Sequence, residues 1–119
     1  MAGVSDFSGP VIDLEGALAR LGGDRNLFAE MANIVLEDAP DLFAKLRVAI
    51  ADNNAAGVRA HAHALKGLIA GCGGVRAVRI VQELEDAGQA SDLRGVNSLV
   101  ESLSVEFDEF TRALRRFQM

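Results

Sequence analysis

Hydrophobic residues recur along this chain every three or four positions, which is the spacing of residues on one face of an α-helix. The clearest series lies toward the carboxyl end and consists of Leu93, Val96, Val100, Leu103, Phe107, Phe110, Leu114 and Phe117. A seam of this kind predicts a long helix that lies along an antiparallel bundle. Ser91 or Asp92, just before the seam, is the expected N-cap of that helix.

A second long apolar stripe runs from Leu27 to Ile50, and Pro40 interrupts it. An interior proline costs a helix about 3 kcal/mol and bends or breaks it. The stripe nevertheless resumes after Pro40 without a polar loop. We therefore expect one kinked helix here, with Asp24 as its N-cap.

A short helix should precede the long ones, because Asp13 can cap its start and Gly22-Gly23 can end it. We expect this helix to lie across one end of a bundle. Residues 1–10 are rich in glycine and serine, show no periodicity and are expected to form a flexible tail. The folded domain should therefore cover residues 11–119.

Two more helices fill the middle of the chain. The first follows the turn at residues 52–54 and runs to about Cys72, and the second continues from Val75 to Gly88. Glycines at positions 71, 73 and 74 supply the reversal between them. No alternating strand pattern competes. The chain is thus predicted to be all-α, an antiparallel up-down-up-down four-helix bundle with a short N-terminal capping helix.

Length, charge and cysteine content restrict the classes of function that the chain can have. At 119 residues the chain has room for one domain, and its net charge of −5 argues against binding to nucleic acid. Cys72 is the single cysteine, so no internal disulfide can form. Without a signal peptide or a long apolar run, we expect a monomer in the cytoplasm that does not bind membranes.

The most unusual side chains lie in the helix expected around residue 63. On one face, His63 shares helical spacing with Arg59, Lys66, Gly67 and Ala70, so an imidazole is flanked by cations and by almost no bulk. The opposite face of this helix carries an apolar stripe, namely Val58, Ala62, Leu65 and Ile69. The stripe should anchor the helix in the core while His63 points outward.

The residues of this region bear on several possible chemistries. A zinc site is disfavoured because His61 and His63, two residues apart, diverge by about 200° on a helix. A nucleophilic Cys72 would need a neighbouring base, and the glycine-rich stretch that follows matches no nucleotide-binding motif. The plain alternative is an ordinary solvated histidine beside a lysine.

A longer sequence pattern around His63 favours a more specific interpretation than a solvated histidine. His63-Ala64-Leu65-Lys66-Gly67, with Ala62 before it and Gly73 after it, resembles the signature of histidine-containing phosphotransfer (HPt) domains of two-component phosphorelays. The flanking segments are also similar to that family, and the likeness runs from about residue 11 to the end. These segments are Ile12-Asp13-Leu14, Leu21-Gly22-Gly23-Asp24, Leu36-Glu37-Asp38-Ala39-Pro40 and Leu84-Glu85-Asp86-Ala87-Gly88.

The resemblance implies a four-helix bundle whose exposed histidine, here His63, accepts a phosphoryl group from an aspartate of one receiver domain and passes it to another. It implies that Lys66 stabilises the phosphoryl group and that Glu85, 22 residues after His63, orients the imidazole. Arg59, Gly67 and Ala70 would belong to the face on which the receiver docks.

The same resemblance predicts a phosphocarrier and not an enzyme with its own ATP site. Response-regulator receiver domains and a hybrid sensor histidine kinase are the expected partners. The chain should need no cofactor of its own, with Mg²⁺ supplied by the receiver. The alternative is a non-catalytic docking module, a pseudo-HPt that binds a kinase or receiver without using the histidine. Bulky Leu68-Ile69 and the added Gly71 and Gly74 depart from the family pattern and leave the end of the histidine helix open.

Overall fold

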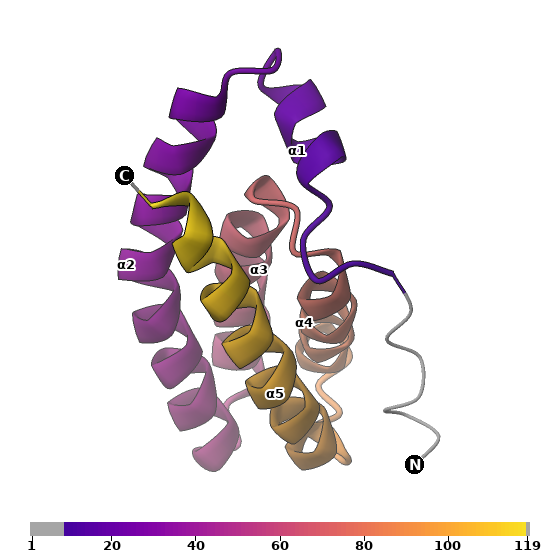
Figure 1. Cartoon of the computed structure of the whole chain (residues 1–119). Coiled ribbons are helices and arrows are strands. Elements are labelled where there is room, and N and C mark those ends of the chain that lie inside the picture. Colours follow the sequence, from indigo (N-terminus) through magenta and orange to yellow (C-terminus); the bar gives the residue numbers. More distant parts are fainter. Residues whose placement is uncertain (1–8, 119) are drawn as a thin grey trace.

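In the computed structural model, which describes residues 9–118, the chain is all-α (Figure 1). No strand occurs within those residues. The helices are α1 (Leu14–Arg20), α2 (Arg25–Ala51), α3 (Ala55–Gly71), α4 (Val75–Gln89) and α5 (Val96–Leu114), followed by a 3₁₀ turn at Arg115–Phe117. None of these helices combines the length and the apolar character needed to span a membrane.

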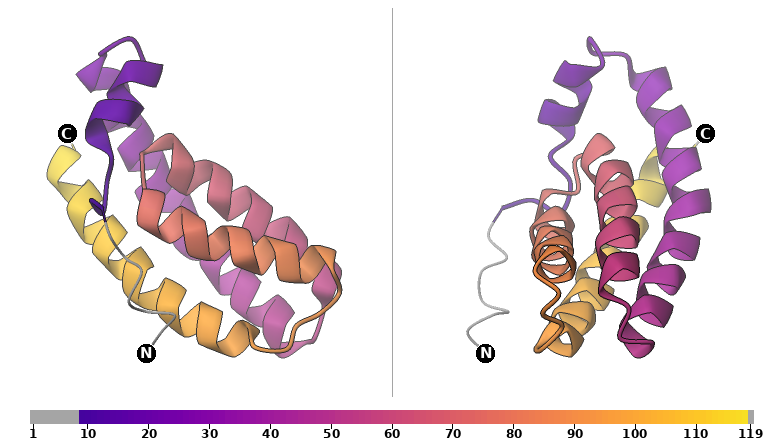
Figure 2. Two further views of the ribbon diagram at one scale, coloured as in Figure 1. Left: turned by 90° about the vertical axis from the view of Figure 1, so that its right-hand side faces the viewer. Right: turned by 180° about the vertical axis from the view of Figure 1, so that it is seen from behind.

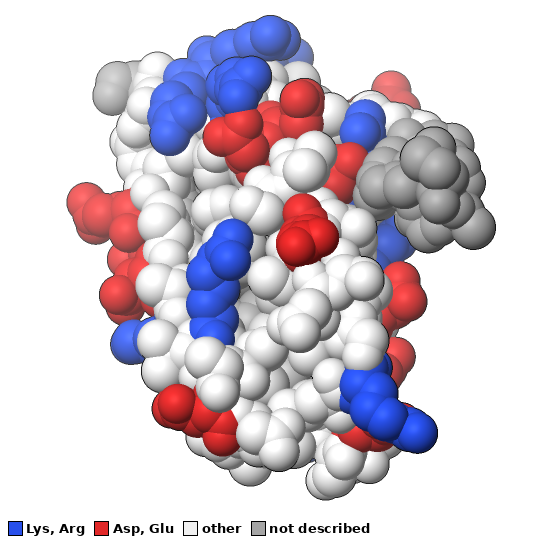
Figure 3. Space-filling model, turned by 90° about the horizontal axis from the view of Figure 1, so that it is seen from below, with Lys and Arg blue, Asp and Glu red and all other residues white. Residues whose placement is uncertain are grey.

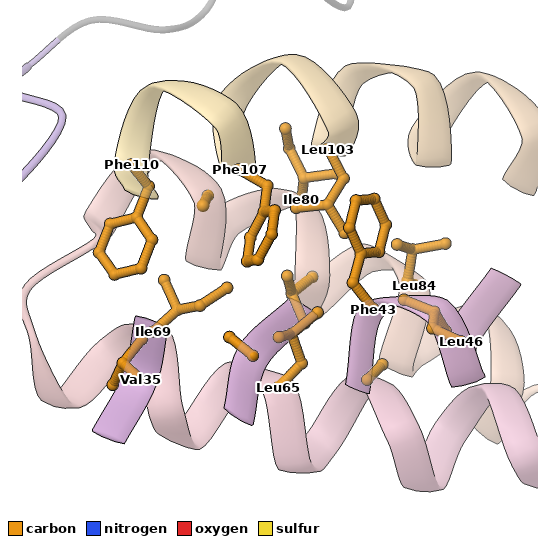
Figure 4. Close-up of a cluster of buried hydrophobic side chains, with 14 of the residues drawn as sticks. Val35, Phe43, Leu46, Leu65, Ile69, Ile80, Leu84, Leu103, Phe107 and Phe110 are labelled. Carbon is orange, nitrogen blue, oxygen red and sulfur yellow. The ribbon is translucent and has the colours of Figure 1, made fainter. Parts of the chain in front are cut away.

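The four long helices lie side by side around one hydrophobic core (Figures 1 and 2). α2 packs against α3, α3 against α4, α4 against α5, and α5 returns to α2. Figure 4 shows side chains from all four helices meeting in the core. They include Val35, Phe43, Leu46, Leu65, Ile69, Ile80, Leu84, Leu103, Phe107 and Phe110. The apolar periods read from the sequence therefore face a common interior.

α1 stands at the end of this group where α2 begins and α3 ends (Figure 1). Its N-cap is Asp13, whose carboxylate accepts a hydrogen bond from the backbone N–H of Gly16 at 3.1 Å. The backbone N–H of Asp13 donates to the carbonyl of Gly73 at 2.7 Å and ties this segment to the turn between α3 and α4. Gly22 and Gly23, both with positive φ, follow the helix as the sequence predicted.

α2 continues through Pro40, which confirms the prediction of one helix over this stretch. Pro40 is exposed, whereas its neighbours Ala39 and Phe43 are buried. The missing N–H and the proline ring thus fall on the solvent side. The buried stripe of α2 is therefore not interrupted.

The predicted start of α5 was wrong by several residues. α5 begins at Val96, after Gly95 with φ of 82°, and neither Ser91 nor Asp92 caps it. The Asp92 carboxylate instead accepts hydrogen bonds from the backbone N–H of Arg94 at 3.2 Å and from its guanidinium at 2.8 Å. Local side-chain hydrogen bonds of this kind compete with helix formation and stabilise a turn.

The carboxyl end also differs from the predicted seam. Phe117 lies in the 3₁₀ turn that follows α5 and not in the helix itself. Its ring still packs edge-on against Phe28 of α2, with 5.2 Å between ring centroids. The last position of the apolar series therefore reaches the core through a turn.

An ion pair fixes α4 against α5 in the interior. Arg76 Nη2 lies 2.9 Å from Glu106 Oε2, and the Glu106 side chain is only 2% exposed. Removing one partner of a buried pair leaves an uncompensated charge and is strongly destabilising. This contact therefore holds the two helices in one register.

Phe110 is fully buried in the core, so its truncation should reduce the stability of the fold. Phe110→Ala should lower the free energy of unfolding by about 3 to 5 kcal/mol, because it leaves a cavity among well-packed side chains. Chemical denaturation measures this loss. Val105→Ala, on the exposed face of the same helix, is the control and should cost less than about 0.5 kcal/mol. A loss below about 1 kcal/mol for Phe110→Ala would contradict the packing described here.

Candidate functional site

His63 lies in the middle of α3 and its side chain is 69% exposed. Ala62 and Leu65 of the same helix are completely buried. The apolar stripe of α3 faces the core, and helical geometry therefore turns the imidazole outward. The ring is accessible to a partner molecule.

Glu85 reaches this imidazole from α4. Its Oε2 lies 2.9 Å from His63 Nδ1, and its side chain is 16% exposed. A carboxylate at this distance accepts the Nδ1–H of the imidazole and selects the tautomer in which Nε2 carries the free electron pair. The contact thus leaves the unprotonated Nε2 at the surface.

Close packing of α3 and α4 makes the contact between His63 and Glu85 possible. Gly88 of α4, three residues after Glu85, is buried against the backbone of α3. A Cβ atom at Gly88 would come within 2.6 Å of the backbone nitrogen of Arg59. The absence of a side chain at this position therefore sets the short distance between the two helices.

Lys66, one turn after His63, also contacts Glu85. Its Nζ lies 2.7 Å from Glu85 Oε1 and 3.0 Å from Gln82 Oε1. The two oxygens of Glu85 are thus divided between the imidazole and the ammonium. The hydrogen bond from Lys66, followed by that from His63, holds the pKa of Glu85 below its ordinary value. Lys66 therefore faces the carboxylate in this structure, and not the open side of the imidazole.

Gln82 was missed in the sequence analysis. It accepts a hydrogen bond from Lys66, and its Nε2 donates to Asp86 Oδ1 at 2.9 Å. Gln82, Glu85 and Asp86 are three and four residues apart and share one face of α4. That spacing was a usable signal, but only the distance between α3 and α4 shows that Lys66 reaches this face.

The remaining predicted site residues lie along the face of α3 around His63. Arg59 is exposed one turn before it. A Cβ atom at Gly67 would meet no heavy atom within 4 Å, so the surface beside the imidazole is open. Ala70 is half-buried, and its carbonyl accepts a hydrogen bond from Arg20 of α1 at 3.0 Å. These residues frame the imidazole.

The residues of the alternative chemistries lie elsewhere. His61 borders a hollow between α2 and α3 together with Lys45 and Val48. Cys72 is buried, and burial raises the pKa of its thiol to about 11, so the thiolate is disfavoured. Within residues 9–118 no three His, Cys, Asp or Glu side chains group in a way that could hold a metal ion.

Charges of both signs share the surface. Figure 3 views the end of the molecule where α2 ends and α5 begins, and it shows Lys and Arg side chains interspersed with Asp and Glu. This face does not present one continuous basic field of the kind that binds a phosphate backbone.

The helical fold with an exposed histidine on α3 defines a class of protein. Comparison with known proteins identifies the family. The Hpt domain family model matches residues 30–117. The chain therefore belongs to the Hpt domain family, whose members transfer phosphoryl groups through a histidine in phosphorelays.

One solved structure is similar over nearly the whole chain. It is the crystal structure of histidine-containing phosphotransfer protein B (HptB) from Pseudomonas aeruginosa PAO1. The similarity has a TM-score of 0.82 with 20% sequence identity, and covers 92% of this chain and 95% of the other. At this identity the comparison supports the fold. No curated protein sequence matches this chain.

Because Lys66 and His63 share the Glu85 carboxylate, we expect a change at Lys66 to alter the titration of Glu85. Because Lys66 lowers the pKa of Glu85, the carboxylate stays charged below its ordinary range, and the stabilisation from this pair is lost as pH falls through the lowered pKa. Lys66→Met should raise the pKa of Glu85 toward its ordinary value. Carbon-13 NMR titration of the Glu85 carboxyl group measures the change.

Lys45→Met is the matched control, since Lys45 pairs with Asp41 on α2 at 3.3 Å and does not contact Glu85. It should leave the Glu85 titration unchanged. Identical Glu85 titration curves for Lys66→Met and the unmodified chain would show that Lys66 does not bind this carboxylate in solution.

Proposed function

We propose that this chain is a phosphorelay intermediate in which Nε2 of His63 accepts a phosphoryl group from a receiver-domain aspartate and then passes it to the aspartate of a response regulator. The donor is a receiver domain, free-standing or part of a hybrid histidine kinase. The observation that carries the proposal is the exposed imidazole of His63, whose Nδ1 is held by Glu85 at 2.9 Å on the Hpt fold.

The chemistry follows from this hydrogen bond. Nε2 attacks the phosphorus of the aspartyl phosphate, so that a nitrogen–phosphorus bond forms and the bond from phosphorus to the aspartate oxygen breaks. The aspartate leaves as a carboxylate, and no proton has to move. The phosphorylated ring keeps its Nδ1–H and becomes cationic, and the adjacent Glu85 carboxylate stabilises that charge. Transfer to the second receiver reverses the same steps.

Lys66 weakens the Glu85 carboxylate as a hydrogen-bond acceptor for His63. A carboxylate with a single partner would attract the Nδ1 proton more strongly, and the ammonium at 2.7 Å offsets part of its charge. Glu85 then orients the imidazole as a hydrogen-bond acceptor and remains ionised. Direct stabilisation of the phosphoryl oxygens by Lys66, which the family resemblance implies, requires its ammonium to swing away from Glu85 once the phosphoryl group is present.

The open surface around His63 supports in-line approach by a receiver. The space beside Gly67 and the small Ala70 allow the partner's aspartate to come close to Nε2, and exposed Arg59 can contact an acidic partner surface. Mg²⁺ bound by the receiver would neutralise the transferring phosphoryl oxygens. The proposal needs no cofactor held by this chain.

We also infer that α2 to α5 form an antiparallel up-down-up-down four-helix bundle with α1 as its cap. Short connections between helices that pack on one another in sequence order support this topology. A monomer in the cytoplasm, where a lone buried thiol such as Cys72 stays reduced, completes the proposed state of the chain.

Substitution of His63 tests the assignment directly. His63→Gln should abolish phosphoryl acceptance from radiolabelled phosphorylated receiver domains, because no nucleophilic nitrogen remains, while the thermal melting curve stays nearly unchanged. His61→Gln is the matched control and should retain transfer. A phosphorylated His63→Gln chain would place the site elsewhere. Failure of the unmodified chain to accept from any receiver, with binding retained, would favour the docking-module alternative.

Glu85→Ala should slow phosphoryl transfer by about 10- to 100-fold, as expected when a group that orients a reactive imidazole is removed. Single-turnover kinetics at saturating receiver measure the rate. Glu83→Ala, at an exposed position of the same helix, is the control and should change little. Equal rates for the two variants would show that Glu85 has no part in orienting His63.

A further inference from the structure

Lys66 is held by two acceptors on α4, the carboxylate of Glu85 and the side-chain amide of Gln82. The Lys66 Nζ lies 2.7 Å from Glu85 Oε1 and 3.0 Å from Gln82 Oε1. Gln82 and Glu85 are three residues apart, so one face of a single helix presents both acceptors. Gln82 therefore contacts the cation that modifies the Glu85 carboxylate, although it does not contact the imidazole itself.

The amide of Gln82 fits this position in only one orientation. Its Nε2 donates to Asp86 Oδ1 at 2.9 Å, while its Oε1 accepts from Lys66. An ionised carboxylate only accepts hydrogen bonds, and an ammonium only donates them. A flipped amide would turn its NH₂ group toward the ammonium and its oxygen toward the carboxylate, and both contacts would be lost. Asp86 therefore fixes the amide so that its oxygen faces Lys66.

The other lysine of the chain provides a comparison. Within the described residues Lys45 has one partner, Asp41 at 3.3 Å, and its side chain is 56% exposed. The Lys66 side chain is 25% exposed. A single exposed ion pair holds a lysine weakly, because ordering its flexible side chain costs conformational entropy. A second acceptor on the same helix adds a contact to a side chain that is already ordered.

We propose that Gln82 is a positioning residue that keeps the ammonium of Lys66 beside Glu85, one helical turn from His63. Gln82 is neutral, so it holds the ammonium without placing a competing negative charge next to Glu85. Without Gln82, only the Glu85 carboxylate would hold the lysine, and the side chain could extend into solvent. The effect of Gln82 on phosphoryl transfer rests on the proposed function, whereas its hold on Lys66 does not.

Titration of Glu85 in a double-mutant cycle tests the hold on Lys66. Gln82→Met keeps the length of the side chain and suits a helix, but it removes both polar atoms of the amide. We expect it to raise the pKa of Glu85 by less than Lys66→Met does, because the ammonium then spends less time at the carboxylate. In a chain that already carries Lys66→Met, Gln82→Met should leave the Glu85 titration unchanged. Carbon-13 NMR of the Glu85 carboxyl group measures each titration.

Gln89→Met is the matched control, since Gln89 lies at an exposed position of the same helix, seven residues after Gln82. It should not change the titration of Glu85, and thermal melting should show that all the variants are folded. If Gln82→Met leaves the Glu85 titration unchanged, or shifts it equally with and without Lys66, the proposal is overturned.

Single-turnover transfer from a saturating phosphorylated receiver measures the consequence for the reaction. Gln82→Met should slow transfer about 3- to 10-fold, which is less than the loss expected for a group that contacts the imidazole directly. In the Lys66→Met chain it should cause no further loss. Equal slowing in both chains would show that Gln82 does not act through Lys66 and would overturn the proposal.

The two measurements separate this proposal from the proposed function. If no receiver phosphorylates His63 in the unmodified chain while the Glu85 titrations follow the expected cycle, the proposed function fails and the hold of Gln82 on Lys66 stands. If transfer to His63 is observed but Gln82→Met changes neither the titration nor the rate, the proposed function stands and the role of Gln82 is overturned.

Discussion

The site depends on one carboxylate of α4 that is divided between two side chains of α3. Glu85 projects from α4 and holds both His63 and Lys66 of α3, with distances of 2.9 and 2.7 Å. Longer spacing between α3 and α4 would lose both contacts, and Gly88 keeps the helices close because a Cβ atom there would collide with the backbone of α3. A glycine within the helix pair thus determines the orientation of an imidazole at the surface.

The proposed reactive group and the residues that stabilise the core lie on different faces of α3. The buried face of α3, with Leu65 and Ile69, contributes apolar area to the core, whereas His63 remains 69% exposed on the outer face. Changes to the imidazole should therefore affect transfer without unfolding the chain. A partner can also approach Nε2, the proposed phosphoryl acceptor, without any rearrangement of the core.

The sequence predicted helices well because burial of apolar stripes decides where helices form. The stripe that continues beyond Pro40 was sufficient to identify α2 as one helix. The start of α5 was missed because Asp92 has two possible hydrogen-bonding roles, as a helix cap or within a turn, and its local bond to Arg94 favours the turn. Apolar periodicity cannot distinguish those two roles.

Contacts between side chains of different helices were less accessible from the sequence. The family resemblance pointed to Glu85, and the structure places it against His63. The Lys66–Glu85 contact and the link through Gln82 depend on the distance between α3 and α4, which hydrophobic patterning does not set. The buried Arg76–Glu106 pair was missed for the same reason.

The central claim is that Glu85 holds the Nδ1–H of His63 and leaves Nε2 to receive the phosphoryl group. Nitrogen-15 NMR of the imidazole before and after phosphorylation tests it most directly. We expect a hydrogen-bonded Nδ1–H in both states and phosphorus coupling only at Nε2. Phosphorus coupling at Nδ1, or a protonated Nε2 with a bare Nδ1 in the unphosphorylated chain, would contradict the account.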